Sequence, residues 1–182
     1  MTGFDPVKVA LDVALKVKRL VDIAQPERAV ALSRRARELP TLILQTGLMP
    51  ALTFYLSKVE KESVYMLVLK ALEIEAEKMK PDDDDLVKKV KKLAKEIKEE
   101  VEEEGKGYTA LLSISAYILK QFANMYGIEK CKNVYTVAEF VECLHEIRSN
   151  RDKEVMLEKQ FINFMLEVKK LFDAFFKEKE QG

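Results

Sequence analysis

Apolar positions recur every three or four residues along most of the chain, a spacing typical of amphipathic α-helices. No segment alternates apolar and polar residues as a half-buried strand does, and no internal repeat occurs. The clearest stripe lies near the C-terminus and comprises Phe161, Met165, Val168, Phe172 and Phe175, which we expect to be core. The pattern predicts an all-α fold, a compact single-domain bundle of about six to eight helices over residues 1–182.

Capping residues, prolines and glycines set the expected helix boundaries in the first third of the chain. Asp5, followed by proline, predicts the start of the first helix, and Pro26 predicts the start of the second. Pro40 is expected to kink or restart this second helix, because proline lacks a backbone donor and crowds the preceding turn. Gly47 fits a helix C-terminus, and Pro50 fits the first turn of the next helix.

A charged stretch separates the two halves of this pattern. Ser63 predicts the N-cap of a fourth helix, which ends before residue 81. Residues 86–104 then predict a helix with a narrow apolar seam, which Gly105 and Gly107 are expected to terminate. Residues 81–107 are therefore expected to form a charged helical hairpin that can protrude from the bundle.

Three further helices complete the expected fold. The sixth covers residues 109–126, and Gly127 is expected to close it. Thr136 with Glu139 matches a capping box at the start of the seventh. The last helix is expected over about residues 152–179.

Charge is balanced overall but unevenly distributed. The formal net charge is zero, with charged residues making up 34% of the chain. Residues 1–58 carry nine Lys or Arg against five Asp or Glu, whereas residues 73–104 carry eight against thirteen. A free-standing nucleic-acid-binding protein is usually basic overall, so this chain is at most a locally basic binder or one that acts in an array. Its abundance of lysine and glutamate favours a thermophilic source.

The chain has no signal-peptide pattern and no apolar run near the roughly 20 residues that a membrane span requires. Its two cysteines are too few for a disulfide scaffold. We therefore expect a soluble, cytoplasmic protein without a membrane partner.

Arginines cluster on the second predicted helix. Arg34, Arg35 and Arg37 lie close together, and Arg28 precedes Arg35 by one heptad on the same face. The apolar stripe of this helix leaves the arginines pointing outward. The planar donor fork of arginine suits phosphate oxygens, so the cluster is a candidate polyanion site. The alternative is a solvated helix face whose arginines pair with neighbouring glutamates.

Metal and enzyme chemistry find little support in the sequence. Glu142 and His145 have the Glu-x-x-His spacing of di-iron bundles, but such a site requires two of these motifs and the chain has one histidine. Cys131 and Cys143 with His145 match no structural zinc pattern, and we expect these side chains to be packed or solvated. There is no nucleophile elbow and no phosphate-binding glycine loop. We therefore expect no metal, no cofactor and no small-molecule substrate.

Two segments carry a resemblance to a known family. The stretch RARELPTLILQTGLMPALTFYLSK, residues 35–58, resembles the small helical subunit of the Cmr complex, the type III-B CRISPR RNA-guided effector. The shared features are an arginine-rich helix, Leu39-Pro40, an apolar stretch, Gly47-Leu48 and Phe54-Tyr55. The segment VKKLFDAFF, residues 168–176, is similar to the end of that family's last helix.

The resemblance implies a compact helical bundle that is not an enzyme and has no catalytic residues. In the family, copies stack head to tail along a filament that holds the CRISPR RNA (crRNA), and their basic face lies along the groove for target RNA. The implied partners are other Cmr subunits, further copies of the chain and the RNA backbone in antiviral defence. The candidate RNA-binding residues are Arg28, Arg34, Arg35, Arg37, Lys58, Lys61, Arg148, Arg151 and Lys153.

Two other classes of function remain open from the residues alone. One is a helical protein-interaction adaptor without RNA contact, which would bind partner helices through its aromatic stripe or the seam of residues 86–101. The other is a metal-dependent helical enzyme, which would carry stoichiometric metal.

Overall fold

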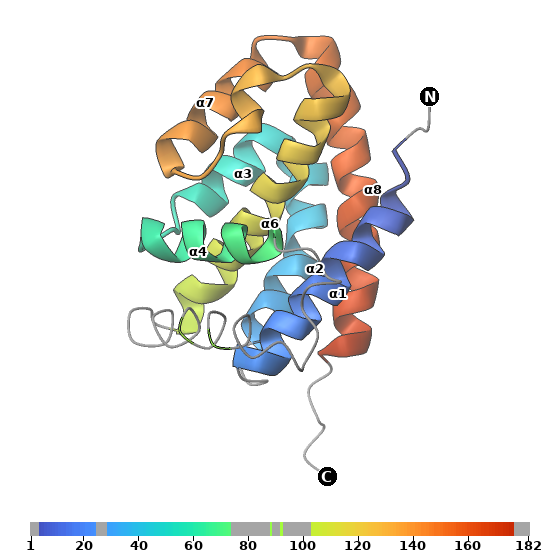
Figure 1. Ribbon diagram of the computed structural model, residues 1–182. Helices are drawn as coiled ribbons and strands as arrows, with labels where there is room; N and C mark the ends of the chain where they lie inside the picture. The colour runs from blue at the N-terminus through green and yellow to red at the C-terminus, as the bar shows by residue number, and fades with distance from the viewer. Residues whose placement is uncertain (1–3, 25–28, 74–87, 89–91, 93–102, 177–182) are drawn as a thin grey trace.

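The computed structural model describes residues 4–24, 29–73, 88, 92 and 103–176 (Figure 1). Within these residues the chain forms seven α-helices and one 3₁₀ helix and contains no strand, which confirms the all-α prediction. The elements are α1 (Pro6–Ala24), α2 (Ala29–Thr46), α3 (Leu48–Leu56), α4 (Glu62–Glu73), α6 (Glu103–Tyr126), η3 (Glu129–Lys132), α7 (Val137–Arg148) and α8 (Arg151–Phe175). Most of the expected hairpin of residues 81–107 lies outside the described residues.

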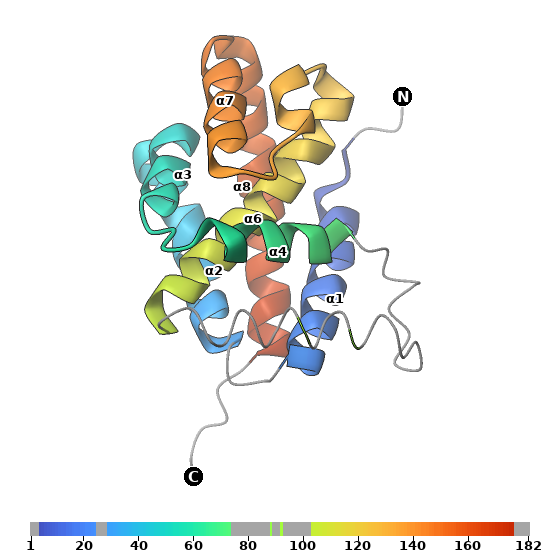
Figure 2. The same ribbon diagram turned by 60° about the vertical axis from the view of Figure 1, so that its left-hand side comes forward.

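The two longest helices, α6 and α8, organise the bundle. Helices α1 and α2 pack against α8, while α2, α3, α4 and η3 pack against α6. Figure 1 shows α1 crossing α8, and Figure 2 shows α7 alongside the upper part of α8, with α3 nearby. Helix α2 contacts both long helices and so connects the two halves of the core.

The predicted aromatic stripe of α8 is confirmed as core. Phe161, Met165, Val168 and Phe172 are fully buried, and Phe175 is partly buried against the same cluster. Burying an apolar side chain of this size contributes about 1.5–3 kcal/mol to the free energy of folding. The stripe is therefore used within the bundle and does not form the partner surface that an adaptor would need.

The predicted N-caps of the first and seventh helices are confirmed. The Asp5 carboxylate accepts hydrogen bonds from the backbone N–H groups of Val7 (3.0 Å) and Lys8 (3.1 Å). At α7, the Thr136 hydroxyl accepts from the N–H of Glu139 (3.1 Å), and the Glu139 carboxylate accepts from the N–H of Thr136 (2.9 Å). Both helices thus begin where their side chains satisfy otherwise unpaired backbone donors.

The glycines expected at the C-terminal ends of α2 and α6 are also observed there. Gly47 follows α2 with φ 91°, and Gly127 follows α6 with φ 61°, a left-handed conformation that favours glycine. Pro50 lies in the first turn of α3, as predicted. Ser63, the expected N-cap of the fourth helix, instead lies inside α4, which begins at Glu62.

Of the two outcomes expected at Pro40, a kink or a restart of the second helix, the restart does not occur. Helix α2 continues through it from Ala29 to Thr46. Leu39 and Ile43, on either side of the proline, are fully buried. A proline inside a helix costs about 3 kcal/mol, and burial of these two side chains in one continuous helix is of similar magnitude. Packing of α2 against α6 and α8 therefore offsets the tendency of Pro40 to break the helix.

The glycines expected to end the fifth helix lie inside α6. This helix begins at Glu103, so Gly105 and Gly107 are in its first turns. At Gly107 an added Cβ would lie 2.8 Å from the Ala31 carbonyl oxygen of α2, closer than real Cβ contacts. Gly107 is therefore required for the close approach of two helices and does not terminate one.

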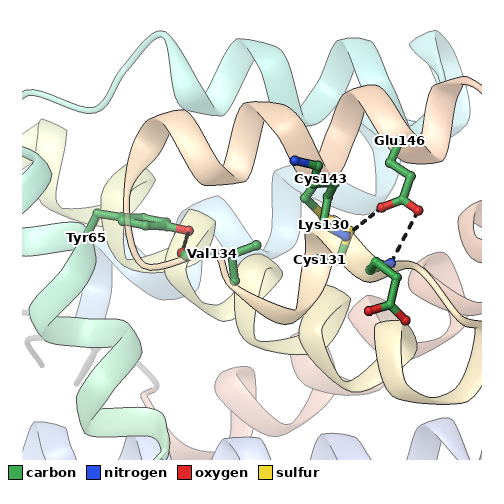
Figure 3. The surroundings of a disulfide bond; sticks show 7 residues. Tyr65, Lys130, Cys131, Val134, Cys143 and Glu146 are labelled. Atoms are coloured by element: carbon green, nitrogen blue, oxygen red, sulfur yellow. Dashed lines mark hydrogen bonds between the residues drawn. A yellow bond between two sulfur atoms is a disulfide. The ribbon is translucent and has the colours of Figure 1, made fainter.

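The cysteines are bonded to each other, which the sequence analysis did not predict. Cys131 of η3 and Cys143 of α7 form a disulfide, and both residues are fully buried (Figure 3). The expectation of separate packed or solvated thiols was wrong because η3 folds back against the buried face of α7. The bond joins two elements that are neighbours in both sequence and space.

Hydrogen bonds surround this disulfide. The Glu146 carboxylate accepts from the backbone N–H groups of Lys130 (2.6 Å) and Glu129 (3.3 Å), and so joins α7 to the start of η3. The Tyr65 hydroxyl of α4 donates to the carbonyl of Val134 (2.5 Å; Figure 3). Burial raises the pKa of this hydroxyl far above its ordinary value. Besides the disulfide, η3 is therefore joined to α7 by Glu146, and the connection between them is joined to α4 by Tyr65.

Candidate nucleic-acid interface

The arginines of α2 differ in their surroundings. Arg34 is exposed and makes no ion pair with any described residue. Arg37 is half exposed, and its Nε donates to the Asp173 carboxylate of α8 at 2.5 Å. The outward direction expected for the cluster therefore holds for Arg34 and Arg37. Arg28 lies outside the described residues.

Arg35 does not point freely into solvent, contrary to that expectation. Its side chain is only 14% exposed and pairs with Glu38 at 2.7 Å. Its guanidinium lies 4.1 Å from the ring centroid of Tyr108 at the start of α6, a cation–π contact. The Tyr55 hydroxyl donates to the Arg35 carbonyl at 3.1 Å. Arg35 therefore connects α2 to an aromatic cluster.

This cluster extends from α6 across α3. The Tyr108 ring contacts the rings of Tyr55 and Phe54 edge-on, at centroid distances of 5.0 and 5.9 Å. Phe54 remains 43% exposed, and the Lys58 ammonium lies 5.4 Å from its centroid. Cationic groups thus lie at both ends of an aromatic row, and one ring of the row faces solvent.

A second pair of arginines lies where α7 meets α8. Arg148 Nη1 donates to both Glu154 carboxylate oxygens at 2.7 and 2.8 Å, and Arg151 Nη1 donates to one of them at 3.0 Å. The Glu154 side chain is only 4% exposed, whereas those of Arg148 and Arg151 are 63% and 72% exposed. The buried carboxylate holds both arginines in place and leaves most of each guanidinium accessible.

One open cleft brings these groups together. It has a volume of about 770 Å³, and Phe54, Ser57, Arg148, Arg151, Glu154 and Glu158 are among its lining residues. Arg148 and Arg151 therefore line the same cleft as Phe54, the ring beside which the Lys58 ammonium lies. We refer to Arg35, Phe54, Lys58, Tyr108, Arg148 and Arg151 as the basic-aromatic strip.

The remaining candidates lie apart from this cleft or are not placed by the structure. Lys61 is exposed in the connection between α3 and α4. The Lys153 ammonium donates to the carbonyl of Gly127 (3.2 Å), beyond the end of α6, and so stabilises a helix terminus. Contact of Lys61 and Lys153 with RNA stays a prediction.

No group of three His, Cys, Asp or Glu side chains suited to a metal ion occurs among the residues described. The Glu142 carboxylate pairs with Lys130 (2.9 Å), and His145 is exposed on α7. Cys131 and Cys143 are joined in the disulfide, so neither offers a thiolate. The structure therefore does not assemble the metal ligands considered from the sequence.

Several components of the site were missed by sequence reasoning. Glu154 and Glu158 resemble ordinary surface charges of a helix, and no local signal indicates that one is buried between arginines. Tyr108 was not singled out, and Phe54 was noted only for the family resemblance. These residues acquire their roles from contacts between α2, α3, α6 and the corner of α7 and α8.

Of the described helices, none has the length and apolarity needed to cross a bilayer. Searches of curated proteins and of solved structures gave no match. The family model of the CRISPR-associated protein (Cas_Cmr5) matches residues 7–174, which include both the arginine-rich segment and the C-terminal helix. The match agrees with the all-helical fold and with the resemblance of residues 35–58. The chain belongs to the Cas_Cmr5 family and is a small helical subunit of the type III-B Cmr complex of CRISPR defence.

Proposed function

We propose that this subunit is non-catalytic, stacks along the crRNA-bound filament of the Cmr complex in the cytoplasm, and contacts target RNA through the basic-aromatic strip. The observation that supports the proposal is that Arg148 and Arg151 line one cleft together with the partly exposed Phe54, and that the Lys58 ammonium lies beside the Phe54 ring. Exposed cations beside an accessible aromatic ring are typical of surfaces that bind single-stranded nucleic acid.

The positions of the cations suit backbone contact. Arg148 and Arg151 keep accessible donors while Glu154 fixes their orientation, which lowers the entropic cost of ordering them on a phosphate. Arg35 has a positioning role. Its guanidinium packs on the Tyr108 ring, and Tyr108 in turn contacts the Phe54 ring. Arg34 is exposed and adds a cation on α2 that makes no ion pair with a described residue.

A net charge of zero is compatible with this role. One copy would bind RNA weakly, since affinity for a polyanion rises with the number of phosphates contacted. Stacked copies would align their strips into one track and gain affinity through multivalency. Guide–target pairing supplies sequence specificity, so this subunit need only hold the strand.

The test uses the assembled, guide-loaded complex. Lys58→Ala/Arg151→Ala removes two cations of the strip while Arg148 keeps its paired hydrogen bonds to Glu154. We expect weaker capture of target RNA and a salt-dependence slope lower by roughly 1.4 per copy, since each phosphate contact on a single strand contributes about 0.7.

The matched control is Lys132→Ala/Lys170→Ala. It removes the same charge from lysines on η3 and α8, which each pair with a glutamate and do not line the cleft. The control should capture target RNA as wild type does. Equal capture and equal salt slopes for both double variants would remove the strip from the RNA path.

The adaptor alternative is favoured by one specific feature, an exposed apolar stripe on α1. Val7, Leu11 and Leu15 are spaced four residues apart and are 48%, 45% and 46% exposed. An amphipathic partner helix could cover such a stripe. If the protein is only an adaptor, Leu11→Ser will reduce its incorporation into the complex, and Lys58→Ala/Arg151→Ala will leave RNA capture unchanged.

A further inference from the structure

Several side chains that line the cleft beside α3 offer hydrogen-bond acceptors. Three of them are hydroxyl side chains, and each already donates its proton to a backbone carbonyl three or four residues earlier. Thr46 donates to the Leu42 carbonyl (2.8 Å), Thr53 to that of Met49 (2.8 Å) and Ser57 to that of Phe54 (2.7 Å). A hydroxyl whose proton is engaged has only lone pairs left for a ligand.

A carboxylate extends this acceptor character. Glu158 of α8 lines the cleft, and its Oε2 accepts from the Leu48 backbone N–H at 2.7 Å. No described residue donates to its Oε1. The N–H at the start of α3 fixes the orientation of the carboxylate, and the helix dipole favours its charge. Glu158 therefore presents a fixed anionic acceptor.

The donors lie on other lining residues. The Arg148 and Arg151 guanidiniums supply exposed N–H groups, and the Phe54 ring lines the cleft and is partly exposed. A nucleotide needs these three elements: donors for its phosphate, a flat apolar surface for its base and polar groups for the base edge. The volume of about 770 Å³ lies within the range of small-ligand sites.

We propose that this cleft binds an unpaired nucleotide and prefers a base that carries an exocyclic amino group, so that cytosine is favoured over uracil. The inference rests on the proposed RNA contact and adds base discrimination to it. Cytosine presents an amino donor at the position where uracil presents a carbonyl acceptor. That carbonyl would face the lone pairs of Glu158 and the hydroxyls, while the amino group would donate to them.

The experiment titrates the isotope-labelled full chain with cytidine 5′-monophosphate and uridine 5′-monophosphate and follows backbone amides by NMR. The two nucleotides share ribose and phosphate, so contacts to the arginines are common to both. We expect the cytidine nucleotide to shift the Leu48, Thr53 and Ser57 amides with an affinity at least about fivefold higher, the effect of one hydrogen bond. Equal affinities would overturn the base preference, and no shift with either nucleotide would overturn the cleft as a nucleotide site.

Glu158→Gln supplies the matched variant. Its side-chain carbonyl can still accept from the Leu48 N–H, and its amide nitrogen turns the fixed acceptor into a donor. The preference for the cytidine nucleotide should fall to near equality or reverse, while the remaining amide spectrum stays that of wild type. An unchanged preference in this variant would overturn the role of Glu158. These outcomes are distinct from the salt-slope test, which can succeed with no base preference at all.

Discussion

Breaking the disulfide between Cys131 and Cys143 should lower the free energy of unfolding substantially. The cysteines are 12 positions apart, so the bond closes a short loop in the unfolded chain. The chain-entropy relation for a loop of this size gives about 3 kcal/mol at 25 °C. Because the bond joins η3 to α7 at a buried position, the folded state keeps the surrounding contacts when the bond is reduced. Most of the effect should therefore arise in the unfolded state.

The assay is urea unfolding followed by circular dichroism, with and without a phosphine reductant. With an m-value on the order of 2 kcal/mol per M, the loss corresponds to a midpoint lower by about 1.5 M. Unfolding in urea with the reductant present ensures that the buried bond is reduced. The control is Cys131→Ala/Cys143→Ala, whose midpoint should not respond to the reductant. A wild-type midpoint that is the same under both conditions would show that the disulfide does not stabilise the fold.

Three further predictions concern the fold. Gly107→Ala should destabilise the protein by about 1 kcal/mol in urea unfolding, because the new Cβ would meet the Ala31 carbonyl at a cost of about 1–3 kcal/mol, which exceeds a gain of about 1 kcal/mol in helix propensity; a more stable variant would contradict the close approach of α2 and α6. Thr136→Ala should cost about 1 kcal/mol through loss of the α7 capping box, measured in the same assay, and no loss would show that the cap contributes nothing. Tyr55 and Tyr65 have raised pKa values because their hydroxyls are buried, so the folded state keeps protons that the unfolded state releases above about pH 10, and stability should fall as pH rises beyond that point. An ultraviolet titration should show that Tyr55 and Tyr65 ionise only on unfolding, and ionisation of all six tyrosines in the folded protein near pH 10 would contradict this burial.

Features governed by neighbouring residues were predictable from the sequence. The caps at Asp5 and Thr136 and the left-handed Gly127 depend on hydrogen bonds or backbone angles within a few positions. The apolar period also placed the core face of α8 correctly, because one repeating pattern fixes one buried side. Local chemistry therefore determined the fold class and several helix ends.

Features governed by contacts between distant segments were not predictable. Pro40 and Gly107 usually interrupt helices, yet both lie inside one, since packing of α2 against its neighbours compensates for the proline and requires the glycine. The pairing of Cys131 with Cys143 likewise depends on η3 folding back onto α7. In each case a tertiary contact outweighs the local preference of the residue.

In the candidate site, too, some features follow from neighbouring residues and others depend on contacts between distant segments. Exposure of Arg34 followed from the apolar stripe of α2, whereas burial of Arg35 depends on Tyr108, which is distant in sequence. Phe54, which lies beside Lys58, and Arg151 line one cleft only because α3 lies against the corner of α7 and α8. A sequence can identify such cations as candidates but cannot group them without the fold.

The most direct measurement of the central claim is ultraviolet crosslinking of target RNA in the assembled, guide-loaded complex, followed by mass spectrometry of this subunit. Crosslinked peptides are expected from the cleft and its border, residues 53–58 and 148–158, with loss of these crosslinks in Lys58→Ala/Arg151→Ala. Crosslinks confined to other faces, or a subunit with none while its neighbours are labelled, would contradict RNA contact through the basic-aromatic strip.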